Sequence, residues 1–96
     1  MSEQDLQTVI LKWLNLNGFW AIKTIITNKK GTPDILACSP KGIFVAIEVK
    51  YGKGTLSKLQ EYTLERIRKN NGIAIAAWDL QTVVDALQSE LTVNRP

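Results

Sequence analysis

The sequence contains no histidine, one cysteine and no long apolar run. Without histidine the chain cannot build a Ser–His or Cys–His nucleophile pair, a His-ligated zinc site or a nuclease that uses histidine as its base. Cys38 alone cannot form an internal disulfide, which is typical of the reducing cytoplasm. No stretch approaches the roughly 18 apolar residues of a membrane span, and residues 1–5 lack the basic and then apolar order of a signal peptide. We therefore expect a cytoplasmic protein without a membrane partner, whose catalytic groups are limited to carboxylates, lysine, tyrosine, hydroxyls or a metal held by oxygen.

The 96 residues are 45% hydrophobic and 22% charged, which is enough for one modest core, and we expect a single domain over residues 1–96. The formal net charge of +3 is unevenly distributed along the chain. Residues 20–58 carry seven lysines against Asp34 and Glu48, whereas the rest carries five basic and seven acidic residues. A basic middle is typical of a face that binds a polyanion, and a solvated lysine surface is the alternative.

Apolar periodicity and turn signals predict seven elements in the order αβββαβα. Ser2 caps a first helix that ends at Asn17-Gly18. Its apolar stripe consists of Leu6, Val9, Ile10, Trp13 and Leu14. Strands are expected at residues 19–26, 34–38, 43–50 and 73–78, a second helix from residue 55 or 57 to about 70, and a last helix after Asp79. Two hairpins followed by a helical crossover predict an α/β fold with a mixed four-stranded sheet flanked by helices.

The sharpest chemical feature is Pro33-Asp34, followed fourteen positions later by Glu48-Val49-Lys50. Side chains alternate along a strand, so Glu48 and Lys50 point to one face. A hairpin register that sets Asp34 beside the end of the third strand would bring two carboxylates and an ammonium together. A divalent cation relieves the repulsion between carboxylates, and Mg²⁺ suits a site completed by water and phosphate oxygens. The alternative is a structural ion-pair cluster that closes the edge of the sheet.

Other polar residues could complete such a site. Glu3 falls within the apolar stripe of the first helix and is expected to face the protein body, with compensation of the helix dipole as the alternative. Gln7, one turn on, either positions substrate or lies at the boundary of the surface. Gln60 follows Ser57 at the spacing of a capping box, which competes with a role in the site. Lys50 is suited to orient an attacking water or to stabilise negative charge on a phosphodiester.

Together these residues resemble a virus-type replication-repair nuclease (VRR-NUC) domain of the PD-(D/E)XK nuclease superfamily, in its stand-alone bacteriophage-like form. The resemblance runs from Glu3 to about Trp78, with the motifs in order. They are Glu3…Gln7, Asn17-Gly18-Phe19, Gly31-Thr32-Pro33-Asp34-Ile35-Leu36, Phe44-Val45-Ala46-Ile47-Glu48-Val49-Lys50 and Gly54-Thr55-Leu56-Ser57-x-x-Gln60. The resemblance implies a metal-dependent nuclease with an active site at the edge of a mixed sheet.

Carried over residue by residue, the resemblance assigns the metal to Asp34, Glu48 and the backbone carbonyl of Val49. The implied metal is Mg²⁺, for which Mn²⁺ can substitute. Lys50 would be the catalytic lysine. Glu3 would act on the metal or its water, and Gln60 would be the glutamine of the helix after the third strand. The chain departs from the commoner pattern at Asp5, where a second glutamate often stands.

Stand-alone members resemble Holliday junction resolvases, which implies branched DNA as the substrate, a homodimer and no organic cofactor. The residues expected to contact DNA are Lys29, Lys30, Lys53, Lys58 and Gln7. Lysine contacts to phosphate give position without base specificity, so we expect selection by DNA shape. Arg66, Arg68 and Lys69 are expected to complement the dipole of the second helix. A non-catalytic DNA-binding module with a nuclease-like fold is the alternative function. The large aromatic residues are expected in the core, with an interface as the alternative: Trp13, Phe19, Trp20, Tyr62 and Trp78.

Overall fold

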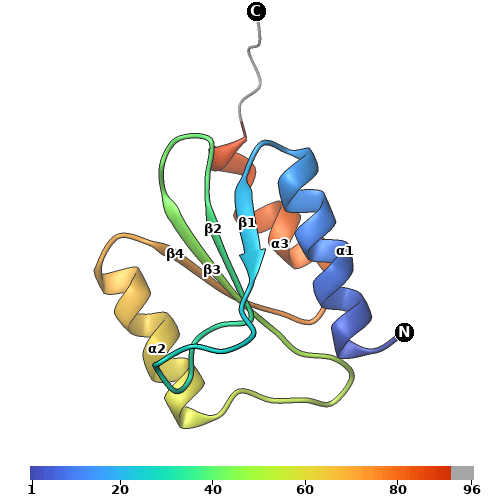
Figure 1. The fold of residues 1–96 in the computed structure, drawn as a ribbon, viewed down its shortest axis with the longest axis vertical. Helices are drawn as coiled ribbons and strands as arrows, with labels where there is room; N and C mark the ends of the chain where they lie inside the picture. Colours follow the sequence, from blue (N-terminus) through green and yellow to red (C-terminus); the bar gives the residue numbers. More distant parts are fainter. Residues whose placement is uncertain (92–96) are drawn as a thin grey trace, which may run out of the picture.

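The computed structural model describes residues 1–91, which form a four-stranded sheet with helices on both faces (Figure 1). The elements are α1 (Glu3–Leu16), β1 (Trp20–Lys23), β2 (Ile35–Cys38), β3 (Phe44–Val49), α2 (Lys58–Lys69), β4 (Ile73–Ala77), α3 (Leu80–Ala86) and a short 3₁₀ helix, η1 (Gln88–Glu90). The strands lie in the order β1-β2-β3-β4. β1–β2 and β2–β3 are antiparallel, and β3–β4 is parallel. The predicted αβββαβα order and mixed sheet are confirmed.

Helix α1 begins and ends at the residues that the sequence signals. The Ser2 hydroxyl accepts a hydrogen bond from the Asp5 N–H at 3.1 Å, and the Asp5 carboxylate accepts one from the Ser2 N–H in return. At the other end Gly18 adopts a φ of +85°, and the Phe19 N–H donates to the Leu14 carbonyl at 3.0 Å. Of the helices in the described part of the chain, none is long and apolar enough to cross a membrane.

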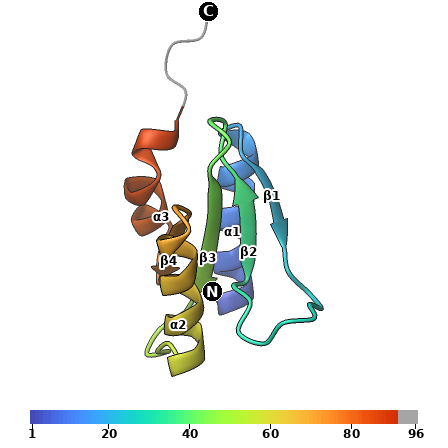
Figure 2. The ribbon, with the colours of Figure 1, turned by 90° about the vertical axis from the view of Figure 1, so that its left-hand side faces the viewer.

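The core lies between the sheet and the helices α1 and α3. Figure 2 views the sheet with α2 in front of it and α1 behind it. From α1 the core takes Leu6, Ile10 and Leu14, and β3 contributes its alternate residues Val45, Ile47 and Val49. Helix α2 covers the opposite face, where β3 presents its other residues, including Glu48. The two faces of β3 are both buried, as its run of apolar residues predicts.

Two expectations about apolar side chains were wrong. Val9, placed in the α1 stripe, is 37% exposed, because it lies about 100° around the helix from Ile10 at the centre of the stripe. Among the aromatic residues, Phe19 is buried, and its ring centroid lies 6.1 Å from that of Trp13. Three others, expected in the core, are exposed by 40% or more: Trp20, Tyr62 and Trp78.

Strand β1 is shorter than the sequence predicts. Beyond Lys23, the last residue of β1, one further backbone hydrogen bond joins the two segments: the Thr24 N–H donates to the Asp34 carbonyl at 2.8 Å. The Thr24 hydroxyl donates to the Pro33 carbonyl at 2.8 Å, and the strand pairing itself ends with Lys23 opposite Ile35. Ile25 and Ile26, expected in the strand, therefore leave the sheet and are 86% and 92% exposed.

Candidate active site

The register of β2 and β3 brings the two central carboxylates together. Ile35 pairs with Ile47, so Asp34, the residue before β2, lies opposite Glu48. The Asp34 Oδ2 atom accepts a hydrogen bond from the Val49 N–H at 2.8 Å. Since the N–H and C=O groups of one strand residue point to the same side, the Val49 carbonyl also points toward Asp34. The structure thus gathers two carboxylates and a backbone carbonyl at the carboxyl end of β3.

Glu48 is 3% exposed, which is an expensive position for a charged group. Burial, a side-chain hydrogen bond with Asp34 and the negative charge of Asp34 together raise the pKa of Glu48 from 4.5 to about 8. The positive charge of Lys50 opposes this increase, whereas the negative charge of Glu3 adds to it. A raised pKa means that the ionised form of Glu48 is destabilised, so this site favours a bound cation or a retained proton.

Lys50 and Gln60 both reach the same oxygen of Glu48. The Lys50 Nζ atom lies 4.0 Å from Glu48 Oε2, and Gln60 Nε2 donates a hydrogen bond to Oε2 at 3.3 Å. At the other end of its amide, Gln60 Oε1 accepts from the Ser57 N–H at 2.9 Å, and the Ser57 hydroxyl accepts from the Gln60 N–H. The capping box and the contact with the site, which are alternatives in the sequence, therefore coexist in one side chain.

Helix α1 contributes less directly to the candidate site. Glu3 is exposed, yet its charge acts on Glu48, so the first turn of α1 lies near the carboxylate pair. Gln7, one turn further, is only 7% exposed, which leaves little of it available to DNA. Its Oε1 atom is buried and has no hydrogen-bond partner among residues 1–91. The structure therefore brings Glu3 toward the site, but it turns Gln7 into the protein rather than toward a DNA backbone.

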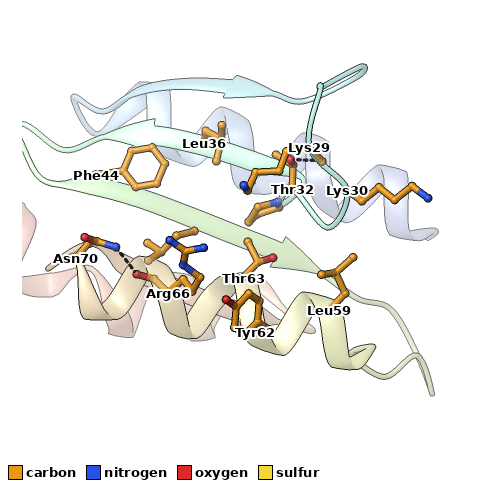
Figure 3. A pocket seen from close by; sticks show the side chains of 13 residues that line it. Lys29, Lys30, Thr32, Leu36, Phe44, Leu59, Tyr62, Thr63, Arg66 and Asn70 are labelled. Atoms are coloured by element: carbon orange, nitrogen blue, oxygen red, sulfur yellow. Dashed lines mark hydrogen bonds between the residues drawn. The ribbon is translucent and has the colours of Figure 1, made fainter.

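The predicted DNA-contacting lysines lie on the surface around this edge. Lys29 and Lys30 belong to the loop between β1 and β2 and line an open pocket against α2 (Figure 3). Lys53, in the loop after β3, and Lys58, at the start of α2, are exposed. The sequence interpretation missed the aromatic side chains of this pocket, although alternation along β3 places Phe44 on the same face as Glu48.

Gly31 fixes the basic loop onto α2. Its φ is +77°, and a Cβ atom at this position would lie 2.7 Å from Leu59 Cγ and 3.2 Å from Thr63 Oγ1. The loop therefore packs closely against the protein's own helix, which holds Lys29 and Lys30 beside α2.

Substitution of Gly31 by alanine is expected to loosen this loop. The variant meets both an unfavourable backbone conformation and a steric clash, so we expect the free energy of unfolding to fall by about 1–3 kcal/mol in urea titrations. Gly42→Ala is the matched control, because Gly42 has a φ of +83° but a Cβ atom there would meet nothing within 4 Å. Equal losses in the two variants would contradict a role for loop packing against α2.

The donor atoms at this edge suit a hard divalent cation. Asp34, Glu48 and the carbonyl of Val49 offer oxygen atoms alone, and Mg²⁺ is commonly bound through one or two carboxylates, with water and substrate phosphates completing the octahedron. Within residues 1–91, no group of three or more His, Cys, Asp or Glu side chains is placed to hold a metal. Two carboxylates and one carbonyl fit an ion whose remaining positions are filled by water or phosphate oxygens.

The comparisons with known proteins identify the family of the chain. The family model of the VRR-NUC domain matches residues 19–78. The chain belongs to the VRR-NUC family. This is a nuclease family, so the resemblance drawn from the sequence motifs is confirmed at the level of the family, and a nuclease domain implies a DNA substrate.

Two solved structures share the fold of this VRR-NUC chain. One, named "VRR_NUC domain", has a TM-score of 0.72 and 19% sequence identity, over 93% of this chain and 97% of that chain. The other, named "VRR_NUC domain protein", has a TM-score of 0.73 and 20% identity, over 94% of this chain and 88% of that chain. No curated protein matches the sequence.

Proposed function

We propose that this VRR-NUC protein is a Mg²⁺-dependent endonuclease that hydrolyses phosphodiester bonds in branched DNA, in the manner of a Holliday junction resolvase. One observation carries the proposal. Asp34, Glu48, Lys50 and Gln60 converge at the carboxyl end of β3, although they come from three separate parts of the chain. Their oxygens suit a divalent cation, and the ammonium beside them suits a phosphate.

Each residue has a distinct role in this proposal. A bound Mg²⁺ or Mn²⁺ ion would supply a water of lowered pKa and positive charge for the phosphodiester. Asp34, Glu48 and the Val49 carbonyl would hold the ion. Lys50 places its ammonium where it can stabilise negative charge that develops on the phosphate. Gln60 is a positioning residue, because its hydrogen bond orients the Glu48 carboxylate.

Two other functions compete with this one. In a non-catalytic DNA-binding module, a pair of carboxylates would repel the phosphate that has to approach it, so the burial of Glu48 would bring no benefit. In a purely structural ion-pair cluster, Lys50 would pair closely with Glu48, whereas the two charged atoms are 4.0 Å apart and Gln60 supplies the nearer donor. Both observations favour catalysis.

We also propose that the protein acts as a homodimer. A dimer with two-fold symmetry presents two active sites to opposing strands of a four-way junction. Edge strand β1 and the segment after it carry exposed apolar side chains, which supports an interface there. They are Trp20, Ile22, Ile25 and Ile26. Sedimentation of the protein should then give the mass of two chains, and Ile25→Lys should reduce it to one.

The function is tested with end-labelled DNA. Four-way junction, flap, single-stranded and linear duplex substrates are incubated with Mg²⁺, with Mn²⁺ or with EDTA, alongside the Lys50→Ala variant. Metal-dependent cutting of branched DNA that is lost in EDTA and in the variant supports the proposal. Tight binding of branched DNA without cutting under either metal would support the non-catalytic module instead, and a fixed recognition sequence in linear duplex would contradict selection by shape.

The two contacts of Gln60 can be separated by mutation. Gln60→Ala removes the donor to Glu48 together with half of the capping box, whereas Ser57→Ala removes only the hydroxyl and keeps the backbone N–H that holds Gln60. We expect each variant to lose about 1 kcal/mol of unfolding free energy. Cleavage should fall about 10- to 100-fold in Gln60→Ala, as for other residues that orient metal ligands. If Gln60→Ala and Ser57→Ala lost cleavage to the same extent, Gln60 would act only as a capping residue.

A further inference from the structure

An open pocket of about 630 Å³ lies between α2 and the face of β2 and β3 that α2 covers (Figure 3). Figure 3 shows Lys29 and Lys30 at one end of the pocket, and Phe44 and Asn70 at the other. Tyr62 and Arg66 line it from α2. A pocket of this size takes a group as large as a small-molecule ligand, and a double helix cannot enter it.

The pocket lies on the same face of the sheet as the candidate active site and is lined by sequence neighbours of the site residues. Phe44 and Glu48 lie on the same face of β3, four residues or about 13 Å apart. In the neighbouring strand β2, Leu36 lines the pocket two residues after Asp34. Pro33, the residue before Asp34, also lines the pocket. A strand whose phosphate lies at the carboxylate pair can therefore extend along this face into the pocket.

The side chains of the pocket combine aromatic rings with positive charge. Tyr62 is 58% exposed and Phe44 is 46% exposed, so part of each side chain is accessible from solvent. The guanidinium carbon of Arg66 lies 5.8 Å from the centroid of the Tyr62 ring. Stacking rings beside a row of cations are the features with which proteins bind single-stranded nucleic acid.

From this placement we infer that the pocket binds unpaired nucleotides of the strand that is cut, next to the scissile phosphate. A base stacks on Tyr62 or Phe44, and the phosphates pair with Lys29, Lys30 and Arg66. The inference rests on the proposed nuclease function and narrows its substrate. Among branched DNAs, those with unpaired nucleotides at the branch are bound more tightly than fully paired ones.

A second copy of the chain is a poorer occupant. In a two-fold contact through this pocket, the lysines and Arg66 of one copy would face the equivalent cations of the other, and like charges across an interface are unfavourable. Within the described chain, neither Lys29 nor Lys30 forms an ion pair with a carboxylate. A polyanion therefore complements the rim of the pocket, and a second basic surface does not.

The test measures binding of the full chain in EDTA, so that no DNA is cut. A labelled short oligothymidylate and a blunt duplex of the same length are titrated by fluorescence anisotropy. Tyr62→Ala should weaken binding of the single strand about tenfold or more, as expected for the loss of one stacked base, while duplex binding stays within about twofold. Tyr62→Phe keeps the ring and should bind like the wild type. Lys30→Ala should weaken single-strand binding more than Lys12→Ala, which removes the same charge from the exposed side of α1.

Equal weakening of single-strand and duplex binding in Tyr62→Ala would overturn the inference. The inference would also be overturned if Tyr62→Ala sedimented as a single chain while its single-strand binding stayed unchanged, because a second copy would then occupy the pocket. Cleavage of flap and fully paired junction in Mg²⁺ separates the two proposals. If no substrate is cut but binding still depends on Tyr62, the nuclease function fails and the pocket stands. If junctions are cut and Tyr62→Ala leaves the preference for flaps unchanged, the pocket inference fails.

Discussion

Replacement of Asp34 by asparagine is expected to reduce DNA cleavage by at least about 100-fold while the protein stays folded and still binds branched DNA. The loss follows because the metal contributes several kcal/mol to the transition state, and each 1.4 kcal/mol is worth about tenfold in rate. The asparagine keeps an oxygen that can accept the hydrogen bond from the Val49 N–H, so the end of β3 retains its partner. Removal of one negative charge also relieves the repulsion on Glu48, and DNA binding should hold or strengthen.

This experiment combines cleavage rates, binding titrations and urea unfolding of the same preparation. Asp85→Asn is the matched control, because it makes the same chemical change on the exposed side of α3, where Asp85 accepts a hydrogen bond from Gln81 at 2.8 Å. Its cleavage rate should equal that of the wild type. A badly destabilised Asp34→Asn protein would instead favour a structural role for the carboxylate cluster, and full cleavage by it would remove Asp34 from the metal site.

The placement of Asp34 opposite Glu48 could be predicted because it depends on local geometry. The short turn at residues 39–42 restricts how β2 and β3 can pair, and the pairing sets Asp34 opposite Glu48. The apolar run that ends in Glu48 and Lys50 likewise predicts a strand buried on both faces, and β3 is such a strand. Residue spacing, alternation along the strand and hydrophobicity all predict the same strand and the same pairing, so a single sequence is enough to predict this part of the site.

The parts that could not be predicted depend on partners distant in the sequence. The β-branched residues after Lys23 favour a strand, but the strand pairing ends with Lys23 opposite Ile35, and Ile25 and Ile26 leave the sheet. The pattern around Gln60 predicts a capping box, and only the packing of α2 on the sheet shows that the other end of its amide reaches Glu48. The pocket beside α2 is likewise formed by side chains of three separate segments, which have no signature together in the sequence.

The stability of the metal-free protein is expected to fall as the pH rises from about 5 to about 8. The folded state holds a proton on Glu48 up to a pKa of about 8, because of burial and the charge of Asp34, whereas the unfolded chain releases that proton near its ordinary pKa of 4.5. Between these values the unfolded state binds fewer protons than the folded state, so the free energy of unfolding decreases with pH and levels off above about 8. The decrease should be on the order of a few kcal/mol.

Glu48→Gln isolates this effect from all other titrating groups. The amide has the shape of the protonated carboxyl but does not ionise, so the difference in unfolding free energy between the two proteins in EDTA should change between pH 5 and pH 8, the window set by the raised pKa. Mg²⁺ has to displace the proton from Glu48, so its affinity and its stabilisation of the wild type should increase over the same window and vanish in Glu48→Gln. A difference that stays flat with pH would show that Glu48 is ionised throughout, and equal stabilisation of both proteins by Mg²⁺ would place the ion away from Glu48.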